Sequence, residues 1–161
     1  MKLPEENVVN TTLYLEFIYE GRLCSSDIKD YEGLKAANCY VALCQMYTFG
    51  ERVCDVSLRN STINELIRLI SLRADSGTNW APNWYTAAEV YRATTVGSPI
   101  RRFLVDVLVT YSNPDWLDRG HEDERTELLV DTLKEFTKKA RDYQNPVDFR
   151  LKTLKAEDYL I

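Results

Sequence analysis

The sequence is poor in the residue types on which most metal and redox sites depend. It has one histidine, His121, and four cysteines, Cys24, Cys39, Cys44 and Cys54, separated by gaps of 15, 5 and 10 residues with no C-x-x-C pair. A zinc site needs closely spaced cysteine and histidine ligands, so we expect no bound metal. We interpret the cysteines as thiols in a reducing compartment, with Cys39, Cys44 and Cys54 packed as small apolar groups of the core.

Phosphate-binding motifs, long apolar runs and an excess of basic residues are also missing. The six glycines form neither G-x-G-x-x-G nor G-x-x-x-x-G-K-[ST], which leaves nucleotide binding unsupported. We expect no cofactor and no small-molecule substrate. No apolar run approaches the roughly 18 residues that span a bilayer, and the first residues do not resemble a signal peptide. The net charge of −5 repels phosphate backbones and anionic lipid. We therefore expect an intracellular protein, cytoplasmic or nuclear, that contacts neither membrane nor nucleic acid.

The remaining composition is typical of a compact helical domain. The chain has 161 residues, of which 45% are hydrophobic, which is enough to bury a core. Between the glycines and prolines the apolar residues recur at helical spacing. The sequence predicts an all-α bundle of about five to six helices. The expected helices cover residues 8–20, 34–53, 56–72, 84–93, 99–111 and 122–143.

Local start and stop signals support these boundaries. Gly21 is expected to end the first helix in the left-handed conformation, and Asp55 to cap the third. Ser98 followed by Pro99 is a strong helix-start signal, since serine caps and proline suits the first helical position. The Asn113–Pro114 pair predicts the end of that helix.

Apolar stripes predict which faces of these helices pack. The first helix carries Val9, Leu13 and Phe17 at steps of four, and the last long helix carries a stripe formed by Leu129, Leu133, Phe136 and Ala140. The last helix begins in acid, at residues 122–124, and ends in base, as the helix dipole favours. The loop at 74–82 is the one candidate boundary, dividing the chain into regions 1–73 and 74–161.

No catalytic constellation stands out. The acidic pairs at helix starts are read as caps, and His121 beside Glu122 has no nucleophile motif near it. A small helical enzyme built around His121 remains an alternative. Two basic groups are read as solvated helix surface, with a nucleic-acid contact as the other alternative. They are Arg101–Arg102 and the cluster of Lys134, Lys138, Lys139 and Arg141.

Aromatic residues gather around the 74–82 loop. The group consists of Trp80, Trp84, Tyr85 and Tyr91. These side chains either anchor a protein partner or pack over the helical core, and the sequence favours neither interpretation over the other.

Several segments resemble one family. Leu-Pro-Glu-Glu at 3–6, followed by Leu-Glu-Phe-Ile-Tyr-Glu-Gly-Arg-Leu at 15–23, resembles the middle of a BTB/POZ domain. The segment Val-Ala-Leu-Cys-Gln-Met-Tyr-Thr-Phe-Gly-Glu-Arg-Val at 41–53, with 55–56 and 60–67, is similar to the closing helix pair of that domain in fungal BTB/POZ proteins. Segments 90–94, 97–102 and 105–106 are similar to the helical extension that follows it.

The resemblance implies a protein-interaction module and not an enzyme. It implies that region 1–73 is the C-terminal half of a BTB/POZ domain and region 74–161 a helical extension packed on it, with the strand-rich N-terminal half absent. An adaptor or scaffold role follows from the same resemblance. We expect a protein partner, with self-association as one form. The candidate partner-binding residues are Val9, Leu13, Phe17, Trp80, Trp84, Tyr85 and Tyr91, the first three because their stripe would need cover from the C-terminal helices, a second copy or a partner.

Overall fold

Every element in the described part of the chain is helical, which confirms the all-α prediction. The computed structural model describes residues 8–21, 23, 34–75, 84–111, 126–142 and 154–161. The elements are α1 (Val8–Glu20), α2 (Leu34–Arg52), α3 (Val56–Asp75), α4 (Trp84–Ala93), α5 (Pro99–Tyr111), α6 (Thr126–Asp142) and a short 3-10 helix, η4 (Ala156–Asp158). Among these residues, none of the helices has the length and apolar character needed to cross a membrane.

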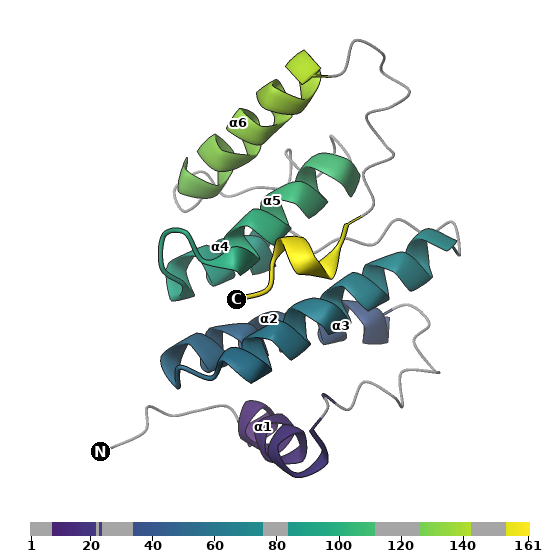
Figure 1. Cartoon of the computed structure of the whole chain (residues 1–161), viewed down its shortest axis with the longest axis vertical. Helices are drawn as coiled ribbons and strands as arrows, with labels where there is room; N and C mark the ends of the chain where they lie inside the picture. Colours follow the sequence, from purple (N-terminus) through teal and green to yellow (C-terminus); the bar gives the residue numbers. More distant parts are fainter. Residues whose placement is uncertain (1–7, 22, 24–33, 76–83, 112–125, 143–153) are drawn as a thin grey trace.

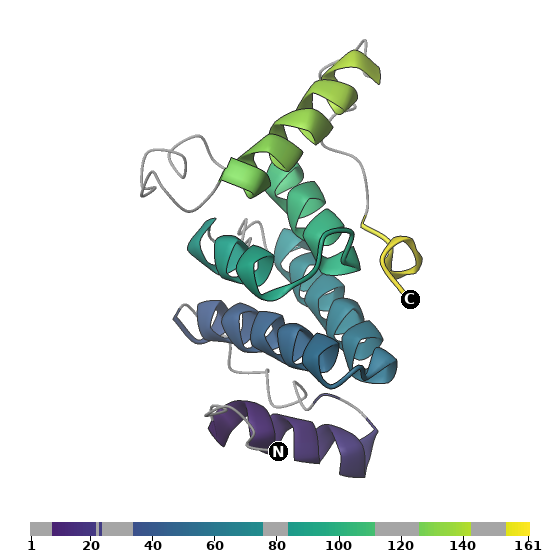
Figure 2. The same cartoon turned by 90° about the vertical axis from the view of Figure 1, so that its left-hand side faces the viewer.

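The helices form a stack with α1 and α6 at its two ends. Figure 1 shows α1 below the α2–α3 pair, α4 and α5 above that pair, and α6 at the top. Turned by 90°, Figure 2 shows the same order, with η4 lying beside α3 and α5. Helix α1 contacts α2, and α6 contacts α5 and α4. The two end helices therefore each have one side packed on the stack and another side directed away from it.

Three start and stop signals in the sequence lie at helix ends as predicted, although Ser98 does not act as the predicted side-chain cap. Gly21 has φ +66° and its N–H donates to the carbonyl of Phe17 at 2.9 Å. Asp55 caps α3, since its Oδ1 accepts the N–H of Leu58 at 2.9 Å. Helix α5 begins at Pro99, but the hydroxyl of Ser98 donates to Glu51 of α2 rather than to its own helix. The Ser98 side chain thus ties α5 to α2.

A tight turn joins α2 to α3, and the two helices pack against each other. The N–H of Asp55 donates to the carbonyl of Gly50 at 2.9 Å, and Cys54 has φ +57°. A Cβ at position 50 would lie 2.9 Å from Cγ of Arg59. Glycine is needed there because the two helices approach too closely for a side chain. Cys54 is exposed in this turn, so the prediction of a core position for it is wrong, whereas Cys44 is buried.

One apolar core crosses the predicted boundary at 74–82. It joins residues of α2 and α3 with residues of α4, α5, α6 and the C-terminal segment. Its fully buried members include Tyr47, Ile63, Phe103, Leu108 and Tyr159. A second, smaller cluster lies between α1 and the α2–α3 pair and contains Phe17, Met46, Phe49 and Leu58.

Candidate interaction surface

The outer face of α6 is apolar and exposed. Leu129 is 41% exposed, Leu133 67% and Phe136 49%. Ala140 continues the stripe and is also exposed, and Val130 beside it is 43% exposed. An apolar stripe on a bundle helix normally faces the core. Here it faces away from it, so we define Leu129, Val130, Leu133, Phe136 and Ala140 as the α6 outer face.

The inner face of α6 docks mainly through polar groups. Leu128 is its one fully buried large apolar side chain among the described residues. Lys139 is 6% exposed, and its Nζ lies 2.9 Å from Oδ1 of Asp106 in α5, which is 9% exposed. The interpretation of Lys139 as solvated surface is therefore wrong. A buried charge is stable only when it is paired, so this contact fixes which side of α6 faces α5.

Asp106 also holds the C-terminal segment. The hydroxyl of Tyr159 donates to Oδ2 of Asp106 at 2.8 Å, and its ring meets Phe103 edge to face at 5.4 Å. Burial, followed by the hydrogen bond to Asp106, raises the pKa of Tyr159. One carboxylate thus joins α5 to both α6 and the end of the chain.

Arg101 makes a second buried polar centre beneath α6. Its Nε donates to Oγ1 of Thr94 at 3.1 Å, another nitrogen donates to the carbonyls of Tyr91 and Thr94, and Nη1 lies 3.0 Å from Glu127 of α6. The guanidinium carbon lies 4.5 Å from the centre of the Tyr91 ring. Arg101 is only 8% exposed, so the interpretation of Arg101 as solvated surface is wrong.

Tyr91 completes the polar contact between α4 and α6. Its hydroxyl donates to Oδ2 of Asp131 at 3.3 Å. Burial, followed by the nearby Asp131 carboxylate, raises the pKa of Tyr91. We call the contacts of Asp106–Lys139, Tyr159–Asp106, Arg101–Glu127 and Tyr91–Asp131 the α6 polar seam.

A cleft of about 490 Å³ runs along this seam between α5, α6 and η4. Its lining carries charges of both signs, among them Arg102, Lys134, Asp106 and Asp158. No group of His, Cys, Asp and Glu side chains in the described ranges could hold a metal ion. The mixed lining gives the cleft no preference for an anion or a cation.

The basic cluster at the end of α6 does not form one continuous basic surface. Lys139 points inward, Lys134 lies 3.5 Å from Asp131, and Lys138 lies 3.7 Å from Glu135. Phosphate recognition needs several lysines and arginines converging on one face. The acids between these lysines reduce the positive potential that such a face would need.

The predicted stripe of α1 packs within the chain. Phe17 is 6% exposed in the cluster with Met46, Phe49 and Leu58. Leu13 is partly buried against the same cluster, and the side chain of Val9 lies outside the described residues. The stripe is therefore buried against α2 and α3. The sequence had instead led us to expect burial against the C-terminal helices, a second copy or a partner.

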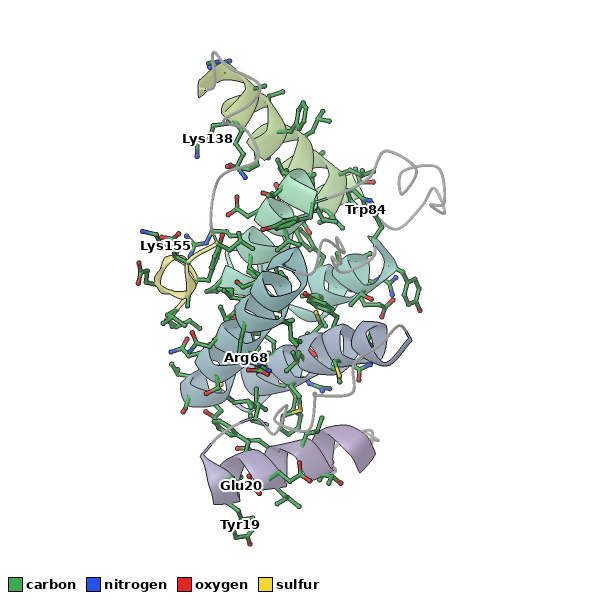
Figure 3. All side chains as sticks on the ribbon, turned by 90° about the vertical axis from the view of Figure 1, so that its right-hand side faces the viewer. Tyr19, Glu20, Arg68, Trp84, Lys138 and Lys155 are labelled. Carbon is green, nitrogen blue, oxygen red and sulfur yellow. The ribbon has the colours of Figure 1, made fainter. Side chains whose placement is uncertain are left out.

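The opposite side of α1 is the exposed one. Leu15 is 48% exposed, Ile18 55% and Tyr19 85%. Figure 3 shows Tyr19 projecting away from the stack at the outer side of α1, while Lys138 lies on α6 at the other end. Sequence periodicity missed this side because α1 is apolar nearly all round.

The aromatic candidates around 74–82 divide between the core and the surface. Trp84 and Tyr91 are 5% exposed and belong to the main core, whereas Tyr85 is 63% exposed. Trp80 lies outside the described residues, as do His121, Cys24 and the acidic residues 122–124. Of the described members, Tyr85 alone presents its ring to solvent.

Cys44 borders a second, smaller cavity. The cavity measures about 310 Å³ and lies between α2 and α4. Burial raises the pKa of the Cys44 thiol to about 12. Because the thiolate is the reactive form, Cys44 is a packing residue rather than a nucleophile.

In the comparisons with known proteins, neither a family model nor a curated protein nor a solved structure matches the chain. The BTB/POZ resemblance therefore depends on the segments quoted above.

Proposed function

We propose that this chain is a protein-interaction module and that the α6 outer face is its contact surface. The observation that carries the proposal is the orientation of α6. The buried ion pair of Lys139 with Asp106 lies on the α5 side, whereas Leu129, Leu133 and Phe136 are exposed. An adaptor or scaffold role, of the kind implied by the BTB/POZ resemblance, would use such a surface.

The energetic argument concerns the apolar area left in water. Each large aliphatic or aromatic side chain gains roughly 1.5 to 3 kcal/mol on full burial. Contiguous exposed apolar patches on a soluble protein commonly mark contact sites. Leu129, Leu133 and Phe136 follow one another at i, i+4 and i+7, which is the spacing of anchors in helix-mediated recognition. The polar seam holds α6 so that this surface is already formed before a partner arrives.

A comparative capture experiment tests the proposal. Wild-type chain, Leu133→Glu and the matched control Ile18→Glu are immobilised and exposed to a lysate, and retained proteins are identified by mass spectrometry. Both substitutions add one carboxylate at an exposed apolar position, one on α6 and one on α1. We expect at least one protein to bind wild type and Ile18→Glu but not Leu133→Glu; a second copy of the chain counts as such a protein. The same protein, once purified, should show this difference in calorimetry.

The contrary result is equally definite. If every purified binder retains its affinity for Leu133→Glu within a factor of two, the α6 outer face is not the contact surface. Circular dichroism of the three proteins checks that the loss of binding does not reflect loss of fold.

A further inference from the structure

We infer that the C-terminal segment 154–161 is a clasp that sets how firmly the C-terminal half of α6 is held to the stack. The clasp acts on α6 through Asp106 of α5, whose carboxylate contacts both. Three observations support this: the anchoring of the segment on α3 and α5, the shared carboxylate, and a second acid beside Lys139. The inference goes beyond the proposed function, because it concerns how α6 is held and not what its outer face binds.

The segment is anchored on α3 and α5. Leu154 and Tyr159 are 6% and 2% exposed and belong to the main core. The side-chain amide of Asn60 in α3 accepts the N–H of Ile161 at 3.0 Å and donates to its carbonyl at 3.2 Å. Figures 1 and 2 show η4 beside α5 and α3, with α6 at the far end of the stack. Because the 490 Å³ cleft lies between η4 and α6, the connection of the segment to α6 runs through α5.

Asp106 serves the segment and α6 with different oxygens. Its Oδ2 accepts the hydroxyl of Tyr159 at 2.8 Å, and its Oδ1 lies 2.9 Å from Nζ of Lys139. One conformation of the Asp106 side chain satisfies both contacts, so each contact helps to hold the carboxylate where the other needs it. Tyr159 also lines the cleft, so its release gives water access to the ion pair. An ion pair that water reaches is weaker than a buried one.

Lys139 has a second acid nearby on its own helix. Its Nζ lies 4.0 Å from Oε1 of Glu135, one turn earlier in α6. When the contact with Asp106 weakens, Lys139 can pair with Glu135, and its charge stays paired. That pair lies within α6 and does not attach the helix to α5. Release of the clasp therefore shifts α6 toward a second, less firmly attached state.

The effect concerns the C-terminal half of α6. In the N-terminal half, Glu127 lies 3.0 Å from Arg101, and Asp131 accepts the hydroxyl of Tyr91 at 3.3 Å. These two contacts do not involve the segment, so they remain when it is released. After Asp131, Lys139 is the only buried side chain among those described in α6. The attachment of the C-terminal half therefore depends on the pair that the clasp supports.

That half of α6 also carries part of the proposed contact surface. Phe136 and Ala140 belong to the α6 outer face and follow the last contact that is independent of the clasp. With the clasp docked, the whole outer face is fixed in place. With the clasp released, Phe136 and Ala140 belong to the loosened half, and the N-terminal part of the face stays fixed.

Amide hydrogen exchange of the full chain, followed by NMR at about pH 7, tests the inference. Exchange through local opening reports the free energy of that opening. Tyr159→Phe keeps the ring and removes the hydroxyl. In this variant we expect the amides of residues 137–141 to exchange faster by about fivefold or more, and those of residues 131–133 to change by less than about twofold. The matched control Tyr85→Phe removes the hydroxyl of an exposed tyrosine and should change neither group.

A second pair of variants tests the same coupling from the other side, because coupling between two sites acts in both directions. Lys139→Met removes the buried ammonium and keeps a long side chain. We expect the N–H of Tyr159, which donates to the carbonyl of Ala156 at 3.0 Å, to exchange faster by about fivefold or more. Lys138→Met removes an ammonium that is 70% exposed and should leave this amide unchanged.

Other results would overturn the clasp. Unchanged exchange of residues 137–141 in Tyr159→Phe would do so, as would equal acceleration in both halves of α6. Residues 137–141 that exchange in wild type as fast as in an unfolded chain would also overturn it, because nothing would then hold that half. The proposed function is tested separately, by binding to Leu133→Glu, so either proposal can fail while the other stands.

Discussion

The two end helices are attached to the stack by opposite means. Helix α1 packs its apolar side inward, with Phe17 against Met46, Phe49 and Leu58. Helix α6 packs its charged side inward, through Lys139, Glu127 and Asp131, and leaves its apolar stripe outside. Apolar packing tolerates small rotations of a helix, whereas a buried ion pair demands one geometry. The polar seam therefore fixes the direction in which the α6 outer face points.

The largest effect is expected from Asp106→Ala. The substitution leaves Lys139 buried without its carboxylate and removes the acceptor of Tyr159. Loss of one partner from a buried pair costs about 3 to 5 kcal/mol, so the free energy of unfolding in urea should fall by that amount. Asp158→Ala, an exposed acid lining the same cleft, is the control and should change stability by less than about 0.5 kcal/mol. Equal effects of the two substitutions would show that the seam does not hold α6.

Phe17→Ala should come next. Removing the ring leaves a cavity between α1 and the α2–α3 pair, and buried Phe→Ala substitutions cost about 3 to 5 kcal/mol. We expect the lower end of that range, since α1 lies at the edge of the stack and its neighbours can partly close the space. Leu15→Ala, on the exposed side of the same helix, should cost less than about 1 kcal/mol. A larger loss from Leu15→Ala would mean that α1 packs by its other side.

Tyr159→Phe should have an intermediate effect that depends on pH. A hydrogen bond to a charged acceptor contributes about 1.5 to 3 kcal/mol, which is the expected loss at pH 7. The pKa of Tyr159 is raised in the folded protein, so its contribution is complete below about pH 10, the ordinary tyrosine value, and declines above it as the unfolded chain ionises first. Melting temperatures between pH 8 and 11.5 should therefore fall less steeply in Tyr159→Phe than in wild type. Parallel curves would contradict this.

The smallest effect is expected at the exposed ion pairs of α6. Lys138 is 70% exposed and 3.7 Å from Glu135, and such pairs contribute between zero and about 1 kcal/mol. Lys138→Ala should change the free energy of unfolding by less than about 0.5 kcal/mol, measured by urea denaturation. A loss above about 1 kcal/mol would place part of the attachment of α6 in its surface charges rather than in the buried seam.

Local signals in the sequence predicted most of the fold. Gly21 and Asp55 mark helix ends through contacts within a few residues, so their meaning can be read without the rest of the chain. Pro99 marks the start of α5, whereas the side-chain contact of Ser98 with Glu51 is not local. The BTB/POZ resemblance, and with it the interaction role, remains a prediction.

The polar seam was not predictable in this way, because its partners lie far apart in sequence. Lys139 and Tyr159 are 33 and 53 residues from Asp106. The available signal was Asp106 itself, an acid within the apolar run from Phe103 to Val109. A buried carboxylate at that position must be paired. Lys139 was a candidate for its partner, because it lies on a helix whose apolar stripe occupies another side. Periodicity alone assigned the stripe to the core and the lysine to the surface.

The orientation of α6 is the central claim, and thiol accessibility measures it directly. Leu128→Cys and Leu133→Cys, each in a background carrying Cys24→Ser and Cys54→Ser, are reacted with a maleimide under native conditions. Leu128 is 1% exposed and Leu133 67%, so the cysteine at 133 should react at least a hundredfold faster. Comparable rates, or faster reaction at position 128, would contradict the orientation on which the interaction surface depends.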